Sequence, residues 1–377
     1  MKKNFLLQKK YNYFLIFLSF FFLLVISLIN INLDNTKVYP EKIKFLKNEI
    51  DLNQIIKKLI LEKGILLFNN EHWSERELAE KMSTYYKNSD CLILGSSQIK
   101  TLSVNQTPKT LVKNCKNPLN LGVSGGTIED YFAILNNINR DELKNKKILF
   151  SIHPYTLNFN RDARWLYYSS NFQEFLKKLK FSDNKIENIE NLRNKNLIKL
   201  IKNLLNFEYL KKSISLILKK KNQVLVVKNS DTNIKNFEFN MLFDGSIIKD
   251  INSSNKNISI EKNYINYKII NERWYDELVF ELILKLKIYL APENKIIFLL
   301  TPYHNDVWSF KEEPIVEAMR LVENRIHKFA KENEINIIGS FDPKNLNCEN
   351  NEFYDALHAS NKCLSKLENY EFKYNKQ

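Results

Sequence analysis

The sequence predicts an α/β fold in which helices cover both faces of a parallel sheet, behind one N-terminal transmembrane helix. Three observations support this prediction: apolar strand-like runs alternate with amphipathic helical segments, glycine and polar residues follow several of these runs, and a long stretch near the N-terminus has no charge. The chain has 377 residues, 44% of them hydrophobic and 27% charged, which is typical of a globular protein.

The N-terminal apolar stretch covers residues 11–33. A helix of this length is about 34 Å long, which is enough to cross a bilayer. Lysines lie in the preceding tail, residues 1–10, so we expect this tail to be cytoplasmic and the rest of a single-pass protein to lie on the periplasmic or extracellular side. The alternative is a cleaved signal peptide, whose apolar core is shorter, about 7–15 residues, and which has a small-x-small cleavage site.

The remaining chain divides by composition into two parts. Residues 34–90 are interpreted as a stalk and helical lead-in, with helical spacing in "EKIKFLKNEIDLNQIIKKLILEKG" and "SERELAEKMSTYYKN". Residues 91–377 are interpreted as the main domain. An insertion at about 165–270 interrupts it, with Lys-rich amphipathic helices, then strands at "QVLVVKN" and "FEFNMLFDGSIIKDI".

The main domain alternates strands and helices. Strands are predicted at "CLILG", "NPLNLGVSGG", "KKILFSIHP", "NKIIFLLTP" and "INIIGSFDP". Helices are predicted at "EDYFAILNNINRDEL", "YDELVFELILKLKIYL" and "EEPIVEAMRLVENRIHKFAKEN". This alternation favours a parallel sheet with helices on both faces.

The formal net charge of +14 leaves nucleic acid as one partner class. The sequence lacks zinc-finger spacing, an RNA-binding aromatic motif and a helix-turn-helix pattern, so we expect no nucleic-acid partner. The basic face of the insertion is interpreted as a solvated surface, with anionic lipid headgroups or an acidic glycan as the alternative ligand.

The four cysteines lie at positions that allow two local pairs. Cys91 with Cys115 and Cys348 with Cys363 is the sequence-local pairing, and four buried free thiols are the alternative. None has metal-ligand spacing, so we expect no metal.

Chemically versatile residues follow three of the predicted strands. In a parallel sheet, reactive groups gather at the carboxyl ends of the strands. "CLILGSSQIK" ends in Ser97, "NLGVSGGT" has adjacent glycines that include Gly125, and "SIHPYT" has His153 and Tyr155. The glycines can direct backbone N–H groups into a cleft.

A fourth motif, "FYDALHAS", lies near the C-terminus. Its Asp355 and His358 are three residues apart and can face one site from a short turn. A serine nucleophile needs a base and a group that orients the base, and Ser97, His358 and Asp355 supply these three types. Asp355 as a cap of the following helix is the structural alternative.

The ordered set of G-x-S, N-x-G-x-S-G and D-x-x-H motifs resembles the SGNH (GDSL-type) hydrolase superfamily, over about 91–160 and 290–365. The resemblance implies a three-layer, flavodoxin-like sheet and no cofactor. It implies Ser97 as nucleophile, His358 as base, Asp355 as orienting group, and backbone N–H groups of Ser97 and Gly125 as the oxyanion hole. The variant GSS behind an anchor is similar to the D-alanyl-transfer protein of teichoic acid synthesis and to proteins that O-acylate alginate.

One family motif is absent. The third block, G-x-N-D, supplies an oxyanion-hole asparagine, and this chain has "SIHPYT" instead. His153, Tyr155 or Asn158 is expected as the replacement donor. A missing donor costs about 10²–10³ in rate, so the departure also fits a weak or inactive protein.

The expected function is therefore a membrane-anchored serine esterase or O-acyltransferase of the cell envelope. Its expected partners are an acyl-bearing glycan or envelope polymer and a polytopic membrane protein that donates the acyl group. The alternatives are an inactive scaffold of an envelope assembly system and a lipid-surface protein that binds through the insertion. His304 is interpreted as a loop residue with the cleft as its alternative, and the "DGS" of residues 244–246 as a hairpin turn with substrate binding as its alternative.

Overall fold

The structure is a computed structural model, and the part of the chain that it describes has several gaps. The described residues are 2–33, 51–68, 75–103, 115–159, 161–182, 206–207, 210–211, 225–227, 239–248, 274–291, 296–309 and 314–374. Much of the expected insertion, and residues 34–50 of the expected stalk, lie outside them.

A six-stranded sheet forms the centre of the described fold, with the strand order β3-β2-β4-β7-β8-β9. The strands are β2 (Cys91–Leu94), β3 (Pro118–Asn120), β4 (Lys147–Ser151), β7 (Ile296–Leu300), β8 (Asn336–Gly339) and β9 (Glu371–Phe372). The first five run parallel, and β9 pairs antiparallel with β8 at one edge. The sequence prediction of a mostly parallel α/β sheet is confirmed.

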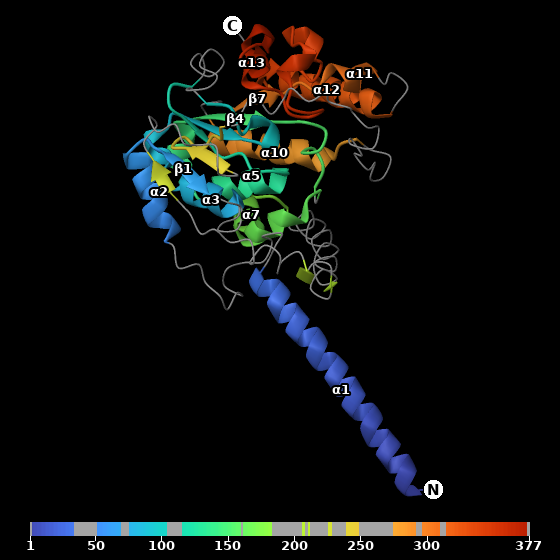
Figure 1. The fold of residues 1–377 in the computed structure, drawn as a ribbon. Coiled ribbons are helices and arrows are strands. Elements are labelled where there is room, and N and C mark those ends of the chain that lie inside the picture. Colours follow the sequence, from blue (N-terminus) through green and yellow to red (C-terminus); the bar gives the residue numbers. More distant parts are fainter. Residues whose placement is uncertain are drawn as a thin grey trace.

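The strands are apolar on both faces because both faces are covered. Leu92, Phe150 and Phe298 face the larger core, together with side chains of α5 (Ile128–Leu135), α7 (Ser169–Lys178), α10 (Glu277–Leu290) and α12 (Pro314–Glu332). Ile93 and Leu149 face a smaller core. The C-terminal segments cover that second face, with α13 (Asn361–Leu364) on the side of the sheet opposite α5 and α10 (Figure 1).

A second, three-stranded antiparallel sheet joins two segments that are far apart in the sequence. Its order is β5-β1-β6, with β1 at Ile65–Phe68, β5 at Leu225–Val227 and β6 at Phe239–Leu242. Strand β1 comes from the expected lead-in, whereas β5 and β6 come from the expected insertion. The lead-in also contributes α2 (Leu52–Leu61) and α3 (Glu75–Ser83) to the larger core, so residues 51–68 and 75–90 pack against the domain.

The sequence reading missed β1 because its apolar run directly continues the helical pattern of α2. The helix ends where the backbone of Lys63 turns left-handed, with φ of 48°, and Gly64 N–H closes the turn on the Leu59 carbonyl oxygen at 3.0 Å. Strand β1 then begins at Ile65.

The N-terminal helix α1 spans Lys2–Leu33 and projects away from the rest of the described chain (Figure 1). Its segment Gln8–Asn32 is long and apolar enough to cross a membrane. The described cysteines form two disulfides, Cys91–Cys115 and Cys348–Cys363. This is the sequence-local pairing, and the alternative of four free thiols is not seen.

Candidate active site

Ser97, His358 and Asp355 lie in one continuous chain of hydrogen bonds. His358 Nε2 is 2.7 Å from Ser97 Oγ, and His358 Nδ1 is 2.8 Å from each carboxylate oxygen of Asp355. When Asp355 accepts a hydrogen bond from Nδ1–H, a neutral imidazole presents the lone pair of Nε2 to the Ser97 hydroxyl. All three residues are partly exposed, so a ligand can reach them from solvent.

Asp355 is held as a carboxylate. Its Oδ1 also accepts hydrogen bonds from the backbone N–H groups of Leu357 at 2.8 Å and His358 at 2.9 Å. Burial alone raises the pKa of this carboxyl, but the hydrogen bonds and charge of His358 outweigh it, so the pKa lies below its usual value. Asp355 does not cap α13, whose N-cap residue is Ser360.

Asp355 and His358 lie at the tip of the acid–base loop, residues 348–363. Two backbone pairings join the segments on either side of this tip. Phe353 and Ala359 form an isolated antiparallel bridge, and Tyr354 N–H donates to the His358 carbonyl oxygen at 2.8 Å. The local pairing explains why two residues three apart in sequence share one side of a turn.

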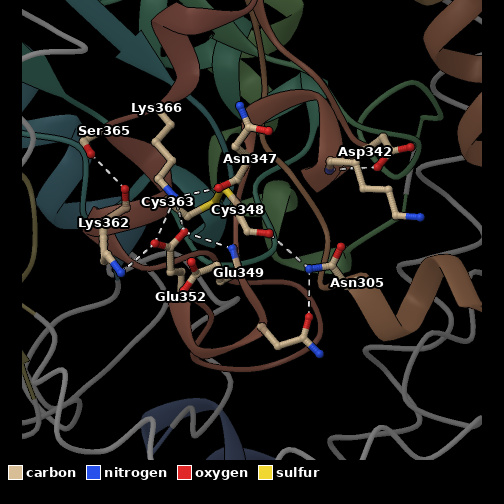
Figure 2. The surroundings of a disulfide bond; sticks show 12 residues. Asn305, Asp342, Asn347, Cys348, Glu349, Glu352, Lys362, Cys363, Ser365 and Lys366 are labelled. Carbon is tan, nitrogen blue, oxygen red and sulfur yellow. Dashed lines mark hydrogen bonds and ion pairs between the residues drawn. A yellow bond between two sulfur atoms is a disulfide. The ribbon is translucent and has the colours of Figure 1, made fainter.

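A disulfide and ion pairs hold the two ends of the acid–base loop together (Figure 2). The disulfide Cys348–Cys363 joins the two ends of the loop. Glu352 is 1% exposed, and its carboxylate contacts Lys362 Nζ at 2.9 Å and Lys366 Nζ at 2.6 Å. Although Cys348, Glu352 and Cys363 lie close enough to share a metal ion, the two sulfurs are bonded to each other and the carboxylate is paired with lysines.

Ser97 begins a short 3₁₀ helix, Ser97–Ile99, directly after β2. We call residues 95–98 the serine turn. Gly95 is needed there because a Cβ atom would come within 2.8 Å of Ser151 Cβ and 2.3 Å of Ile99 Cγ1. The turn therefore packs directly against the end of β4.

Gln98, for which the sequence predicted no role, connects the serine turn to the acid–base loop. Its Nε2 donates to the Leu357 carbonyl oxygen at 3.0 Å, and its Oε1 accepts from Thr301 Oγ1 at 2.9 Å. The side chain is 5% exposed. The position of Gln98 directly after Ser97 is a weak sequence signal for this role, because its partners are more than 200 residues away in the chain.

The second strand end forms the glycine loop, residues 120–127. Asn120 Nδ2 donates to the carbonyl oxygens of Ile99 and Leu102, which ties this loop to the segment after Ser97. Val123 N–H donates to the Gly95 carbonyl oxygen at 3.1 Å. The glycine loop and the serine turn are therefore one hydrogen-bonded unit.

Charged residues of α3, which sequence reasoning missed, support the glycine loop. Glu75 accepts from the Ser124 N–H and from Lys100 Nζ, the latter at 2.6 Å. Arg76 is 3% exposed and forms two hydrogen bonds with Asp130, at 2.7 and 2.8 Å. These residues begin a predicted amphipathic helix, where a charged first turn usually faces solvent.

The backbone N–H groups of Ser97 and Gly125 were the expected oxyanion donors. Among the described residues, neither the Ser97 N–H nor the Gly125 N–H donates to a protein acceptor. Gly125 has φ of +62°, and a Cβ there would come within 2.3 Å of Arg164 Nη2 and 2.4 Å of Asp162 Oδ2. The left-handed φ favours glycine at this position, and the two close atoms are ends of side chains that can shift.

The three expected replacement donors are placed differently. His153 Nε2 is 2.9 Å from Ser96 Oγ, Tyr155 Oη lies 3.5 Å from the Gly125 carbonyl oxygen, and Asn158 Nδ2 donates to the carbonyl oxygens of Pro154 and Trp274. Asn158 thus has a structural role, whereas His153 contacts the residue before Ser97 and Tyr155 contacts Gly125.

The other candidate residues lie in structural positions. His304 is buried, its ring packs edge-on against Phe353, and its backbone N–H donates to the Ala356 carbonyl oxygen, so it supports the acid–base loop. Asp244 is buried in its turn and accepts from Ser246 N–H at 3.0 Å and Ser246 Oγ at 2.6 Å. This bonding agrees with the turn interpretation rather than substrate binding.

No model of a known protein family matches this sequence, and no curated protein matches it. A functional assignment therefore depends on the residue pattern and on the contacts described above.

Proposed function

We propose that this protein is a membrane-anchored serine esterase or O-acyltransferase that acts outside the cytoplasm on an acyl group of a cell-envelope polymer. The observation that supports the proposal most strongly is the hydrogen-bond chain from Ser97 through His358 to Asp355, with Nε2 2.7 Å from Oγ. The resemblance of the motifs to SGNH hydrolases is an independent argument from the sequence, and it assigns the same residues.

The proposed reaction has two half-reactions. Ser97 Oγ attacks the acyl carbonyl carbon while His358 Nε2 takes its proton, and the tetrahedral intermediate expels the first alcohol, which takes that proton. In the second half-reaction, water or a sugar hydroxyl gives a proton to His358 and attacks the ester carbon. The ester bond to Ser97 then breaks, and Ser97 Oγ recovers the proton. Water as acceptor gives an esterase, and a sugar hydroxyl gives an O-acyltransferase.

The negative charge that develops on the carbonyl oxygen needs donors in a fixed position. The uncommitted N–H groups of Ser97 and Gly125 are the donors we assign. Asp355, as a carboxylate, stabilises the imidazolium that forms on His358.

The proposed location follows from the N-terminus. Helix α1 keeps the domain at the membrane surface, where envelope polymers are assembled, and lysines 2, 3, 9 and 10 favour a cytoplasmic N-terminus. Protease added to intact spheroplasts should degrade the domain, and protection of the domain would contradict this orientation.

The test is covalent labelling of the full chain in detergent with a fluorophosphonate, followed by intact mass and peptide mapping. We expect one adduct on Ser97 that Ser97→Ala and His358→Ala abolish. Ser170→Ala, an exposed serine in α7, and His327→Ala, a helical histidine whose Nδ1 lies 2.9 Å from Tyr374 Oη, are the matched controls and should be labelled like the wild type.

Absence of an adduct on the folded wild type would overturn the proposal and favour the alternative of an inactive scaffold. An adduct that His358→Ala does not reduce would overturn the assignment of His358 as the base.

A further inference from the structure

His153 and Tyr155 form a stacked pair between the two segments that supply the oxyanion N–H groups. Their ring centroids are 5.7 Å apart and their planes differ by 13°. The His153 ring contacts the hydroxyl of Ser96, the residue before Ser97, through Nε2. The Tyr155 hydroxyl lies 3.5 Å from the carbonyl oxygen of Gly125. The pair therefore links the serine turn to the glycine loop from the end of β4.

The imidazole of His153 is held in place on several sides. Its backbone N–H donates to Thr156 Oγ1 at 3.1 Å, and Thr156 Oγ1 donates back to the His153 carbonyl oxygen at 2.9 Å. The residue is 4% exposed, and Nδ1 is buried without a hydrogen-bond partner among the described residues. Within the described ranges, its ring makes one hydrogen bond, the one to Ser96.

The imidazole of His153 is uncharged near neutral pH. Burial, and the nearby charge of His358, lower its pKa to about 3. A neutral ring adds no positive charge beside the imidazolium that forms on His358. Its influence on Ser97 is therefore geometric.

Ser96 is joined to Ser97 by one peptide group, so a restraint on Ser96 also restrains the Ser97 N–H. Ser96 is 3% exposed, and its backbone is extended, with φ of −91° and ψ of −165°, before the 3₁₀ helix begins at Ser97. The peptide group that joins Ser96 to Ser97 includes the Ser97 N–H. A hydrogen bond that fixes the Ser96 side chain thus restrains the orientation of that N–H.

We propose that His153 is a positioning residue that fixes the Ser97 N–H through the Ser96 hydroxyl, and so replaces a side-chain oxyanion donor with a better-oriented backbone donor. The inference rests on the proposed function. It differs from direct donation by His153, because it requires the Ser96 hydroxyl.

A double-mutant cycle separates the two mechanisms. The variants are Ser96→Ala, His153→Ala and the double variant of the full chain, and the readouts are kinact and KI for fluorophosphonate labelling of Ser97. We expect each single variant to lower kinact about tenfold with KI unchanged, and the double variant to be no slower than the slower single variant. His153→Gln, which retains a donor, should recover part of the rate.

Two results would overturn the inference. One is a loss of about 10²–10³ in His153→Ala while Ser96→Ala labels like the wild type, because this pattern indicates direct donation. The other is additivity of the two single effects. Each variant is first compared with the wild type by urea denaturation, and His327→Ala serves as the histidine control.

A second readout does not depend on catalysis. Hydrogen–deuterium exchange of the peptide that covers residues 94–100 should be faster in both Ser96→Ala and His153→Ala, and to the same extent. Unchanged exchange overturns the inference even if labelling is slowed. If the wild type is not labelled at all, the proposed function fails, and exchange alone decides the role of His153.

Discussion

Removal of the Cys348–Cys363 disulfide should slow the labelling of Ser97 in protein that is still folded. The change is the double variant Cys348→Ser with Cys363→Ser. The disulfide spans a sequence separation of 15, and both Asp355 and His358 lie inside the loop that it closes. Opening a loop of this size corresponds to about 3 kcal/mol of chain entropy.

This entropy is gained by the unfolded chain. In the native state, removal of the disulfide also separates the two ends of the acid–base loop, so we expect the loop to move more. The contacts of Glu352 with Lys362 and Lys366 remain in the variant and hold the base of the loop. We expect this added motion to lower the fraction of correctly placed His358, and with it the labelling rate, about tenfold, which corresponds to roughly 1.4 kcal/mol.

The other disulfide provides a matched control. Cys91–Cys115 has a sequence separation of 24, so its removal should destabilise the protein by about 0.4 kcal/mol more on the same entropy scale. Cys91 begins β2, whereas Ser97 follows the opposite end of that strand. Its removal should therefore affect stability at least as much and labelling much less.

The assay is urea denaturation of both double variants, followed by labelling rates in buffer where each is at least 95% folded by its own denaturation curve. Equal labelling of the Cys348/Cys363 variant and the wild type would refute the argument that the disulfide positions the base. Equal slowing of Ser97 labelling by both disulfide variants would refute the argument that the effect comes from the acid–base loop.

Three further changes have predicted outcomes. Gly125→Ala places an alanine at φ of +62°, and the nearest atom, Arg164 Nη2, is the end of a side chain that can shift. We therefore expect a stability loss of about 1–2 kcal/mol, the usual cost of a left-handed non-glycine residue, measured by urea denaturation; wild-type stability would contradict the loop geometry. Asp130→Asn leaves the buried guanidinium of Arg76 without its partner and should cost about 3–5 kcal/mol in the same assay, and a loss below about 1 kcal/mol would count against it. Burial raises the pKa of Glu323 to about 7, so the folded protein binds a proton that the unfolded chain releases, and the wild type loses stability as the pH rises from about 4.5 to 7. Glu323→Gln should remove this loss, which is about 1.4 kcal/mol per pH unit. Parallel stability–pH curves for the two proteins would refute this prediction.

The strands of the parallel sheet were predictable because strands buried on both faces are apolar throughout. "CLIL", "KILFS" and "IIFLL" appear as β2, β4 and β7 at the expected places. The antiparallel sheet was not predictable as a unit, because β1 is separated from its partner β6 by more than 170 residues. Local periodicity contains no information about such a pairing.

The acid–base residues were predictable for a related reason. Ser97 follows a recognisable strand, and Asp355 and His358 lie in one short motif, so the sequence shows two parts that the fold must bring together. Gln98 and Arg76 were not predictable as supporting residues, because their roles depend on burial and on partners from other elements. A polar residue in a sequence gives no sign of whether water or a distant carbonyl oxygen will satisfy it.

The supporting residues bear on whether the domain is an enzyme or a scaffold. The buried pair Arg76–Asp130 and the pair Glu75–Lys100 both lie at the glycine loop, which contains Gly125. Buried ion pairs contribute little to net stability, because desolvation offsets their attraction, and apolar residues of similar size often stabilise a protein as well. Net stability alone therefore gives little reason for two such pairs at this loop. Their hydrogen bonds do fix the direction of the loop backbone, which is the property that an oxyanion hole requires.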